Sequence, residues 1–131
     1  MRIKYLLPFV LIFCFSACSS LVFFSAGTAA GVGGYKFYKG SLTVIYQAPY
    51  MDTWDATLRA LDKMNLQIES KKHDLTKGKI KARTADNKQV HISLKYKSSE
   101  QTEVVIRVGI FGDKAASMVI KDEIRKELFE S

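Results

Sequence analysis

The sequence predicts an α+β domain, a two-layer sandwich in which an antiparallel sheet carries two helices on one face. Two observations support this prediction. Apolar and polar residues alternate in five segments after residue 40, which is typical of half-buried strands. Two other segments carry apolar residues every three or four positions, which is typical of amphipathic helices. The predicted order is β-α-β-β-β-β-α, and the apolar face of such a sheet must be covered by the helices.

The first strand is predicted over residues 41–47 and the first helix directly after it. The apolar positions of the strand are Leu42, Val44 and Tyr46. Pro49 ends the strand, because proline has no backbone N–H to donate. Asp52 is a candidate N-cap, and the inner face of the helix is predicted to comprise Trp54, Leu58, Leu61 and Met64. Trp54 is therefore expected to be a core anchor rather than the wall of a ligand pocket.

Four more strands follow, joined by short turns, and a helix ends the chain. The strands are predicted at residues 66–73, 79–84, 89–97 and 102–111. Short turns between consecutive strands favour an antiparallel meander. Asp113 is predicted to cap the last helix, whose apolar stripe comprises Ala116, Ile120, Ile124 and Leu128. Phe111 and Gly112, just before this cap, form either a functional turn or a plain strand-to-helix corner.

The N-terminal segment is typical of a bacterial lipoprotein signal. A basic start and an apolar run over residues 5–15 precede two small residues and Cys18. This pattern resembles a lipobox, in which the cysteine thiol is diacylated and the cysteine becomes the first residue of the mature chain. The resemblance implies a signal peptide at residues 1–17 and a stable membrane anchor, because two or more acyl chains hold a protein at a bilayer. Ser19 after the cysteine resembles the sorting pattern of outer-membrane lipoproteins and implies a domain facing the periplasm.

Two alternatives compete with the lipoprotein interpretation: a secretory signal with an incidental cysteine, and an uncleaved membrane helix. The second is considered because no charged residue lies between Lys4 and Lys36. Residues 18–39 are predicted to be the lipidated cysteine and a Gly/Ala-rich tether, and residues 40–131 the folded domain. Small residues spaced four apart over residues 27–34 also suit close helix packing and oligomerisation. The aromatic and basic residues at 35–39 suit either a membrane interface or an edge strand.

The charge of the chain favours anionic partners. The sequence has 20 Lys and Arg residues against 13 Asp and Glu, a formal net charge of +7. For an exported protein the expected partners are anionic lipid, lipopolysaccharide or an envelope protein, and not nucleic acid. Both cysteines lie at or before residue 18, so the folded part has no disulfide and no thiolate metal site.

The sequence predicts no enzymatic activity and no cofactor. His73 and His91 fall on outward strand positions and form no cluster with metal-ligand spacing. The outward face of the sheet is instead rich in cations, predicted at Lys71, Lys79, Lys81, Arg83, Lys95, Lys97 and Arg107. The candidate residues for binding an anionic surface are Lys79, Lys81, Arg83, Lys95 and Arg107. The alternative is a solubility coat, because lysine on an open sheet discourages pairing with other chains.

Three segments resemble an uncharacterised family of small bacterial lipoproteins, one of the domain-of-unknown-function families. They are YQAP followed by WDATL at residues 46–58, GKIKA at 78–82 and RVGIFGD at 107–113. The resemblance covers about residues 35–129 and implies no activity, since the family has none assigned. More loosely, the pattern resembles helix-grip domains, including the lipoprotein accessory subunit of the outer-membrane protein assembly machine, which implies a fold and no function.

These observations predict a membrane-anchored envelope lipoprotein that acts as a non-enzymatic interaction module for a protein or an anionic envelope component. The alternative is a carrier that holds an apolar ligand between helix and sheet. A cavity beside Trp54 would favour the carrier, and a filled core would favour the interaction module.

Overall fold

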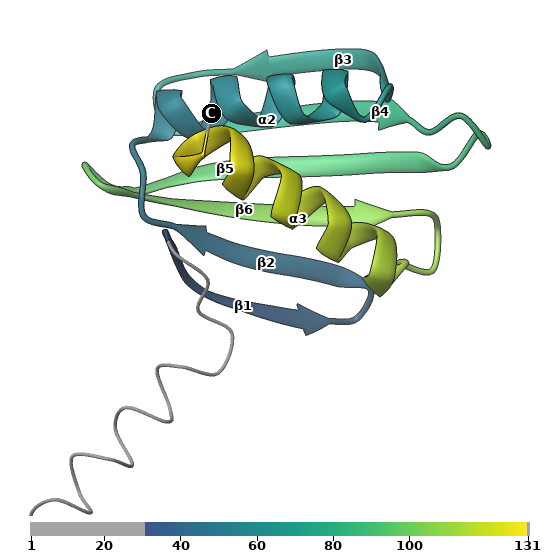
Figure 1. Ribbon diagram of the computed structural model, residues 1–131, viewed down its shortest axis with the longest axis horizontal. Helices are drawn as coiled ribbons and strands as arrows, with labels where there is room; N and C mark the ends of the chain where they lie inside the picture. The colour runs from purple at the N-terminus through teal and green to yellow at the C-terminus, as the bar shows by residue number, and fades with distance from the viewer. Residues whose placement is uncertain (1–30, 131) are drawn as a thin grey trace, which may run out of the picture.

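The computed structural model describes residues 31–130, which form a six-stranded antiparallel sheet with two helices packed on one face (Figure 1). The elements are β1 (Val32–Tyr38), β2 (Ser41–Tyr46), α2 (Tyr50–Lys63), β3 (Gln67–His73), β4 (Lys77–Arg83), β5 (Gln89–Ser98), β6 (Gln101–Val108) and α3 (Lys114–Phe129). The strands lie in the order β1-β2-β6-β5-β4-β3. The predicted fold class is confirmed, and the predicted order of elements holds from β2 to α3.

The core lies between the sheet and the two helices. Every second residue of β2 and β6 is buried, as the alternation in the sequence predicts; these residues are Leu42, Val44, Tyr46, Thr102, Val104, Ile106 and Val108. Ile120 and Ile124 of α3 cover them. Helix α2 begins at Tyr50 behind Pro49, earlier than Asp52 predicts, and its buried Thr53 hydroxyl donates to the Pro49 carbonyl at 2.9 Å. Asp52 therefore lies in the first turn, where its charge suits the helix dipole.

Strand β1 corrects the predicted tether, because residues 32–38 belong to the sheet. β1 pairs with β2 along its length, with Tyr35 opposite Val44 and Phe37 opposite Leu42. The Lys121 ammonium on α3 lies 4.2 Å from the centre of the Tyr35 ring, which fastens the strand to the helix layer. The edge-strand alternative for this segment is thus confirmed. Cys18 and the rest of residues 1–30 lie outside the described residues.

Strand β3 contains a bulge that reverses the predicted facing of its second half. The register shifts between Ile68 and Ser70, and Lys71 then pairs with Ile80 on the helix side of the sheet. His73 also faces that side, with its ring centre 4.6 Å from that of Trp54. The predicted outward position of Lys71 and His73 is therefore wrong, because one extra residue moves all later side chains to the opposite face.

Strand β6 ends at Val108, three residues before the predicted end. Gly109 turns the chain with a φ of +75°, a conformation that glycine adopts without strain. Ile110 and Phe111 consequently leave the sheet, and they are 80% and 92% exposed. The predicted cap of α3 is confirmed, since the Asp113 carboxylate accepts a hydrogen bond from the Ala116 amide at 3.0 Å.

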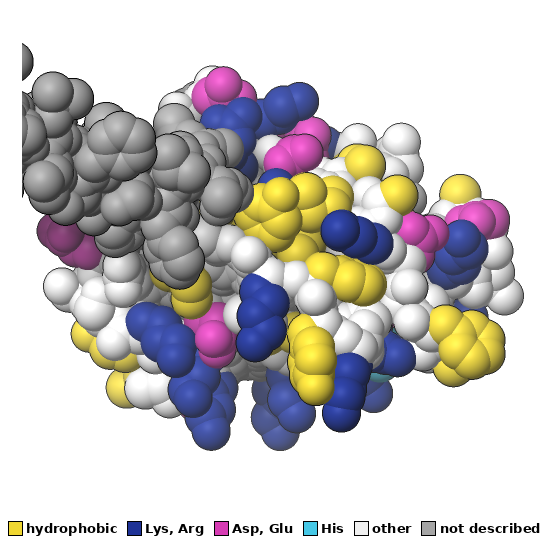
Figure 2. Space-filling model, turned by 90° about the horizontal axis from the view of Figure 1, so that it is seen from below, with side chains coloured by type: hydrophobic (Ala, Val, Ile, Leu, Met, Phe, Trp, Pro, Cys, Tyr) yellow, Lys and Arg dark blue, Asp and Glu magenta, His cyan; other side chains and the backbone are white. Residues whose placement is uncertain are grey.

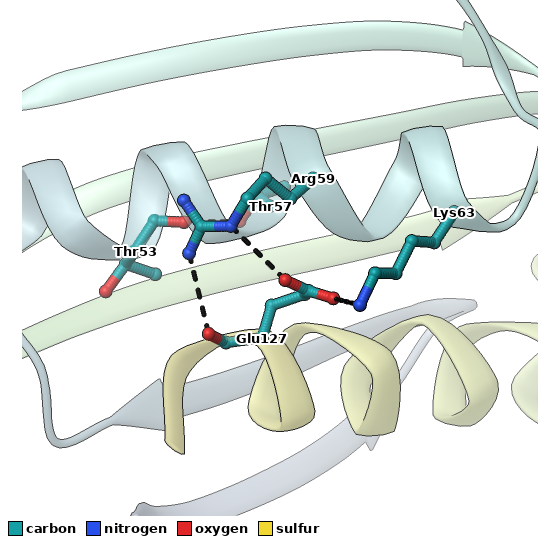
Figure 3. Close-up of polar contacts among 5 residues, drawn as sticks. All are labelled: Thr53, Thr57, Arg59, Lys63 and Glu127. Atoms are coloured by element: carbon teal, nitrogen blue, oxygen red, sulfur yellow. Dashed lines mark hydrogen bonds and ion pairs between the residues drawn. The ribbon is translucent and has the colours of Figure 1, made fainter. Parts of the chain in front are cut away.

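A buried carboxylate joins the two helices (Figure 3). Glu127 of α3 is 3% exposed and pairs with the ammonium of Lys63 and with the Arg59 guanidinium, whose Nε lies 3.2 Å from Oε2. The hydrogen bond from Lys63, and then that from Arg59, hold the pKa of Glu127 below its ordinary value of 4.5. Both cations come from α2, so this cluster fixes how the helices lie against each other.

Candidate functional site on the open face of the sheet

Lysines gather on the face of the sheet that carries no helix. The cross-strand register places Lys72 of β3 opposite Lys79 of β4, and Lys77 of β4 opposite Lys95 of β5. Lys81 lies beside them, opposite His91. Directly opposite residues on one face have Cβ atoms about 4.5–5.5 Å apart, so these ammonium groups share one surface. We call these five residues the lysine cluster: Lys72, Lys77, Lys79, Lys81 and Lys95.

Figure 2 views the molecule from the side of β1. Dark-blue Lys and Arg side chains line its lower margin, on the side of the sheet opposite the helices. All five members of the lysine cluster are exposed. Among residues 31–130, no carboxylate lies within ion-pair distance of any of them. The pairs Lys72–Lys79 and Lys77–Lys95 place like charges opposite each other, which destabilises a sheet, whereas Lys95 also has Glu103 of β6 opposite it.

The lysine cluster borders a depression of about 370 Å³ at the end of the β3–β4 hairpin. Its lining includes Lys72, Lys77, Lys79 and Lys81. Asp74 is the acidic residue of this lining, and its carboxylate accepts hydrogen bonds from the amides of Thr76 and Lys77, each at 2.8 Å. Those two bonds, and to a smaller extent the charge of Lys77, lower the pKa of Asp74, whose carboxylate is thus engaged mainly in the turn.

The structure brings together three of the five predicted site residues, Lys79, Lys81 and Lys95. Arg83 lies at the far end of β4, where its Nε donates to Glu69 at 2.5 Å and its Nη1 to Asn87 at 3.0 Å. The Arg107 guanidinium donates to the backbone carbonyls of Lys39 and Ile110. Both arginines are thus occupied by contacts within the domain.

Sequence reasoning missed Lys72 and Lys77 as members of the site. Lys72 reaches the open face only because of the bulge in β3, and no residue in that segment signals the bulge. Lys77 was expected in a turn, whereas β4 begins with it. An alternation that starts at Lys77 and continues through Lys79 and Lys81 would have identified it.

Within residues 31–130, no group of three His, Cys, Asp or Glu side chains is arranged to hold a metal ion. None of the helices between those residues combines the length and the apolar character needed to cross a bilayer.

Fold and site together define a small two-layer α+β domain with a basic open sheet face. The chain belongs to the protein family of unknown function DUF3568, whose family model matches residues 3–127. The expected membership of an uncharacterised family is thereby confirmed. A search of curated proteins finds no match.

Proposed function

We propose that this protein is an outer-membrane lipoprotein whose periplasmic domain is a non-enzymatic interaction module for an anionic envelope component. The observation on which this proposal rests is the lysine cluster, five exposed ammonium groups on adjacent strands without a carboxylate partner in the described residues. A surface rich in phosphate, such as lipopolysaccharide or anionic lipid, would supply the missing counter-charge. An acidic envelope protein has the same complementarity and is the second source of that charge.

The anchor is proposed from the N-terminal sequence. Small residues precede Cys18 after an apolar run, and the family match begins at residue 3, so it includes this segment. Cells that produce the chain and are fed a labelled fatty acid should incorporate it, and Cys18→Ser should abolish the labelling. Label that persists in Cys18→Ser would contradict the anchor, and recovery in inner-membrane fractions alone would contradict the outer-membrane location.

The surroundings of Trp54 favour an interaction module over a carrier. Trp54 is 4% exposed, and a carrier would need space beside its indole. Instead, a Cβ atom built on Gly78 would lie 2.6 Å from the ring, which shows how closely the β4 backbone approaches. The His73 ring covers another part of the indole. These contacts support a filled core at that point.

Charge reversal on the open face tests the binding role. The variant Lys79→Glu with Lys81→Glu should lose retention on immobilised lipopolysaccharide, and wild-type retention should weaken between low and physiological salt because ions screen the attraction. The matched control is Lys71→Glu with Lys126→Glu, which makes the same change of charge at exposed positions of β3 and α3 away from the open face. Equal retention of both variants, or no wild-type retention at low salt, would show that the lysines are a solubility coat.

A further inference from the structure

Three exposed side chains form an apolar tip at one end of the sheet. Tyr38, at the end of β1, is 61% exposed, and Ile110 and Phe111, between β6 and α3, are 80% and 92% exposed. The two connections meet, because the Arg107 Nη1 donates to the Lys39 carbonyl at 2.8 Å and the same guanidinium also donates to the Ile110 carbonyl. Figure 2 shows yellow side chains projecting at its right-hand end, where Figure 1 places the connection from β6 to α3.

The backbone holds this tip in place. Gly40 and Gly112 have φ values of +85° and +82° and face each other so closely that a Cβ on Gly112 would lie 2.2 Å from the Gly40 carbonyl oxygen. The loop is closed at its base by the Asp113 amide, which donates to the Val108 carbonyl at 2.8 Å. These contacts hold the base of the loop in the conformation that exposes Ile110 and Phe111.

Cations without carboxylate partners surround the tip on the side of β1. The ammonium groups of Lys36 and Lys39 lie 5.4 and 5.3 Å from the centre of the Tyr38 ring, and that of Lys114 lies 6.0 Å from the Phe37 ring. No ion pair within residues 31–130 involves these three lysines. On the opposite side Lys88 is neutralised by Asp86 and Asp113, at 4.0 and 3.6 Å. The positive charge is thus concentrated beside the aromatic residues.

We propose that the apolar tip inserts into the interfacial region of an anionic lipid bilayer. Tyrosine favours the headgroup level, projecting apolar side chains suit the acyl boundary, and lysines are attracted by anionic lipid. Three exposed apolar side chains are a small surface for a protein partner, because a stable protein interface buries about 800 Å² on each side. The inference does not use the lysine cluster, which lies on β3, β4 and β5, away from β1 and the connection from β6 to α3.

The proposed lipid anchor is compatible with this contact. Gly31 lies at the opposite end of β1 from Tyr38 (Figure 1). A fully extended chain gains about 3.3–3.6 Å per residue, and a seven-residue strand is about 23 Å long. At full extension, the residues between Cys18 and Gly31 would therefore span more than the length of β1. The anchored domain can therefore turn its far end toward the bilayer that holds the anchor.

Fluorescence quenching by lipid tests the insertion. The full-length chain carrying Phe111→Trp is mixed with vesicles of equal parts phosphatidylethanolamine and phosphatidylglycerol, with and without bromine-labelled acyl chains. The matched control is Leu75→Trp, which replaces an 88% exposed apolar residue in the β3–β4 turn at the other end of the sheet. Trp54 is buried and contributes the same background to both. We expect the added tryptophan of Phe111→Trp to lose most of its emission on labelled vesicles, and that of Leu75→Trp to keep it.

The outcomes separate this inference from the proposed function. Quenching of Phe111→Trp that survives Lys79→Glu with Lys81→Glu supports insertion whether or not the lysine cluster binds. If the vesicles float with the protein but the emission of Phe111→Trp is not quenched, insertion of the tip is wrong and the anchor is still supported. Equal quenching of both variants in the background of Lys79→Glu with Lys81→Glu overturns it as well, since the tip would then not be the end that enters. A chain that neither floats with vesicles nor is quenched overturns the tip and the anchor together.

Discussion

Positive charges have different partners on the two faces of the sheet. On the covered face, Arg59 and Lys63 meet a carboxylate that is 3% exposed, and the cluster joins α2 to α3. On the open face, no ion pair in the described residues involves the lysine cluster, and lysines face each other across strands, although Glu103 of β6 lies opposite Lys95. The cations between the helices are therefore paired within the fold, whereas we propose that the lysine cluster is left for a partner. Substitutions on one face therefore test whether the stability or the binding that depends on the other face changes.

The largest effect is expected from Trp54→Ala on the covered face. Truncating a buried large aromatic residue costs about 3–5 kcal/mol, because the transfer free energy is lost and a cavity remains. Urea denaturation should show this loss in the free energy of unfolding. Retention on lipopolysaccharide should be unchanged under conditions where the variant stays folded. A loss below about 1 kcal/mol, the range of surface substitutions, would mean that the indole is not packed in the core.

Glu127→Gln should have the next largest effect. It removes the charge that both cations of α2 contact, so the two ion pairs that join the helices are lost, although Arg59 and Lys63 are themselves more than half exposed. Glu130→Gln is the matched control, since Glu130 is 55% exposed and pairs only with Arg125, at 3.3 Å. The urea midpoint of Glu127→Gln should fall clearly below those of the control and the wild type. Equal midpoints for the two variants would show that the cluster does not hold the helices together.

The same variant should alter the dependence of stability on pH. The pKa of Glu127 is lowered in the folded protein, so its contribution to stability is complete above the ordinary value of 4.5 and is lost as the pH falls through the folded-state pKa. Wild-type stability should thus decline in acid, and Glu127→Gln should decline less steeply. Some decline should remain, because hydrogen bonds also lower the pKa values of Asp74 and Asp113. Parallel curves for wild type and variant would contradict the shift at Glu127.

Tyr46→Phe tests a smaller polar contact within the covered face. The Tyr46 hydroxyl donates to the Lys121 carbonyl at 2.8 Å and joins β2 to α3. Losing one such hydrogen bond should cost about 0.5–1.5 kcal/mol. Tyr35→Phe is the control, because it removes a hydroxyl at a more exposed ring and keeps the contact with Lys121. If the two variants have equal free energies of unfolding, the Tyr46 bond contributes nothing to stability.

The dependence of the free energy of unfolding on pH in the alkaline range is a second test of the environment of Tyr46. We call this range the alkaline limb. Burial, and then the charge of Asp122, raise the pKa of Tyr46 above its ordinary value of 10.0. Unfolding lets the phenol ionise near 10.0, so stability is complete below that pH and falls as the pH rises above it. Tyr46→Phe should flatten this limb, and parallel curves for the variant and the wild type would contradict the shift at Tyr46.

Elements that local interactions determine could be predicted from the sequence, whereas features that depend on tertiary packing could not. Alternation in β2 and β5 and the Asp113 cap are local signals, and they identified strands and a helix start correctly. β1 reads as a linker because Gly33 and Gly34 lower its strand propensity, and pairing with β2 overrides that propensity. The bulge in β3 and the turn at Gly109 depend on tertiary packing, so Lys72, Ile110 and Phe111 could not be placed from alternation alone.

The smallest effect on stability is expected from Lys79→Glu on the open face. This variant is also the most direct test of the difference between the two faces. The new carboxylate would stand opposite Lys72, where the wild type has two ammonium groups, and an opposite-charge pair across strands contributes about 0.2–1 kcal/mol. Stability should therefore stay the same or rise slightly, while retention on lipopolysaccharide falls. Lys71→Glu, one residue from Lys72 but on the helix side opposite Ile80, should change retention little. Opposite signs for stability and binding in Lys79→Glu would show that the open face is shaped for a partner at some cost to the fold. A loss of stability that matches the loss of binding would instead mean that Lys79 serves the fold, as Arg59 and Lys63 do on the covered face.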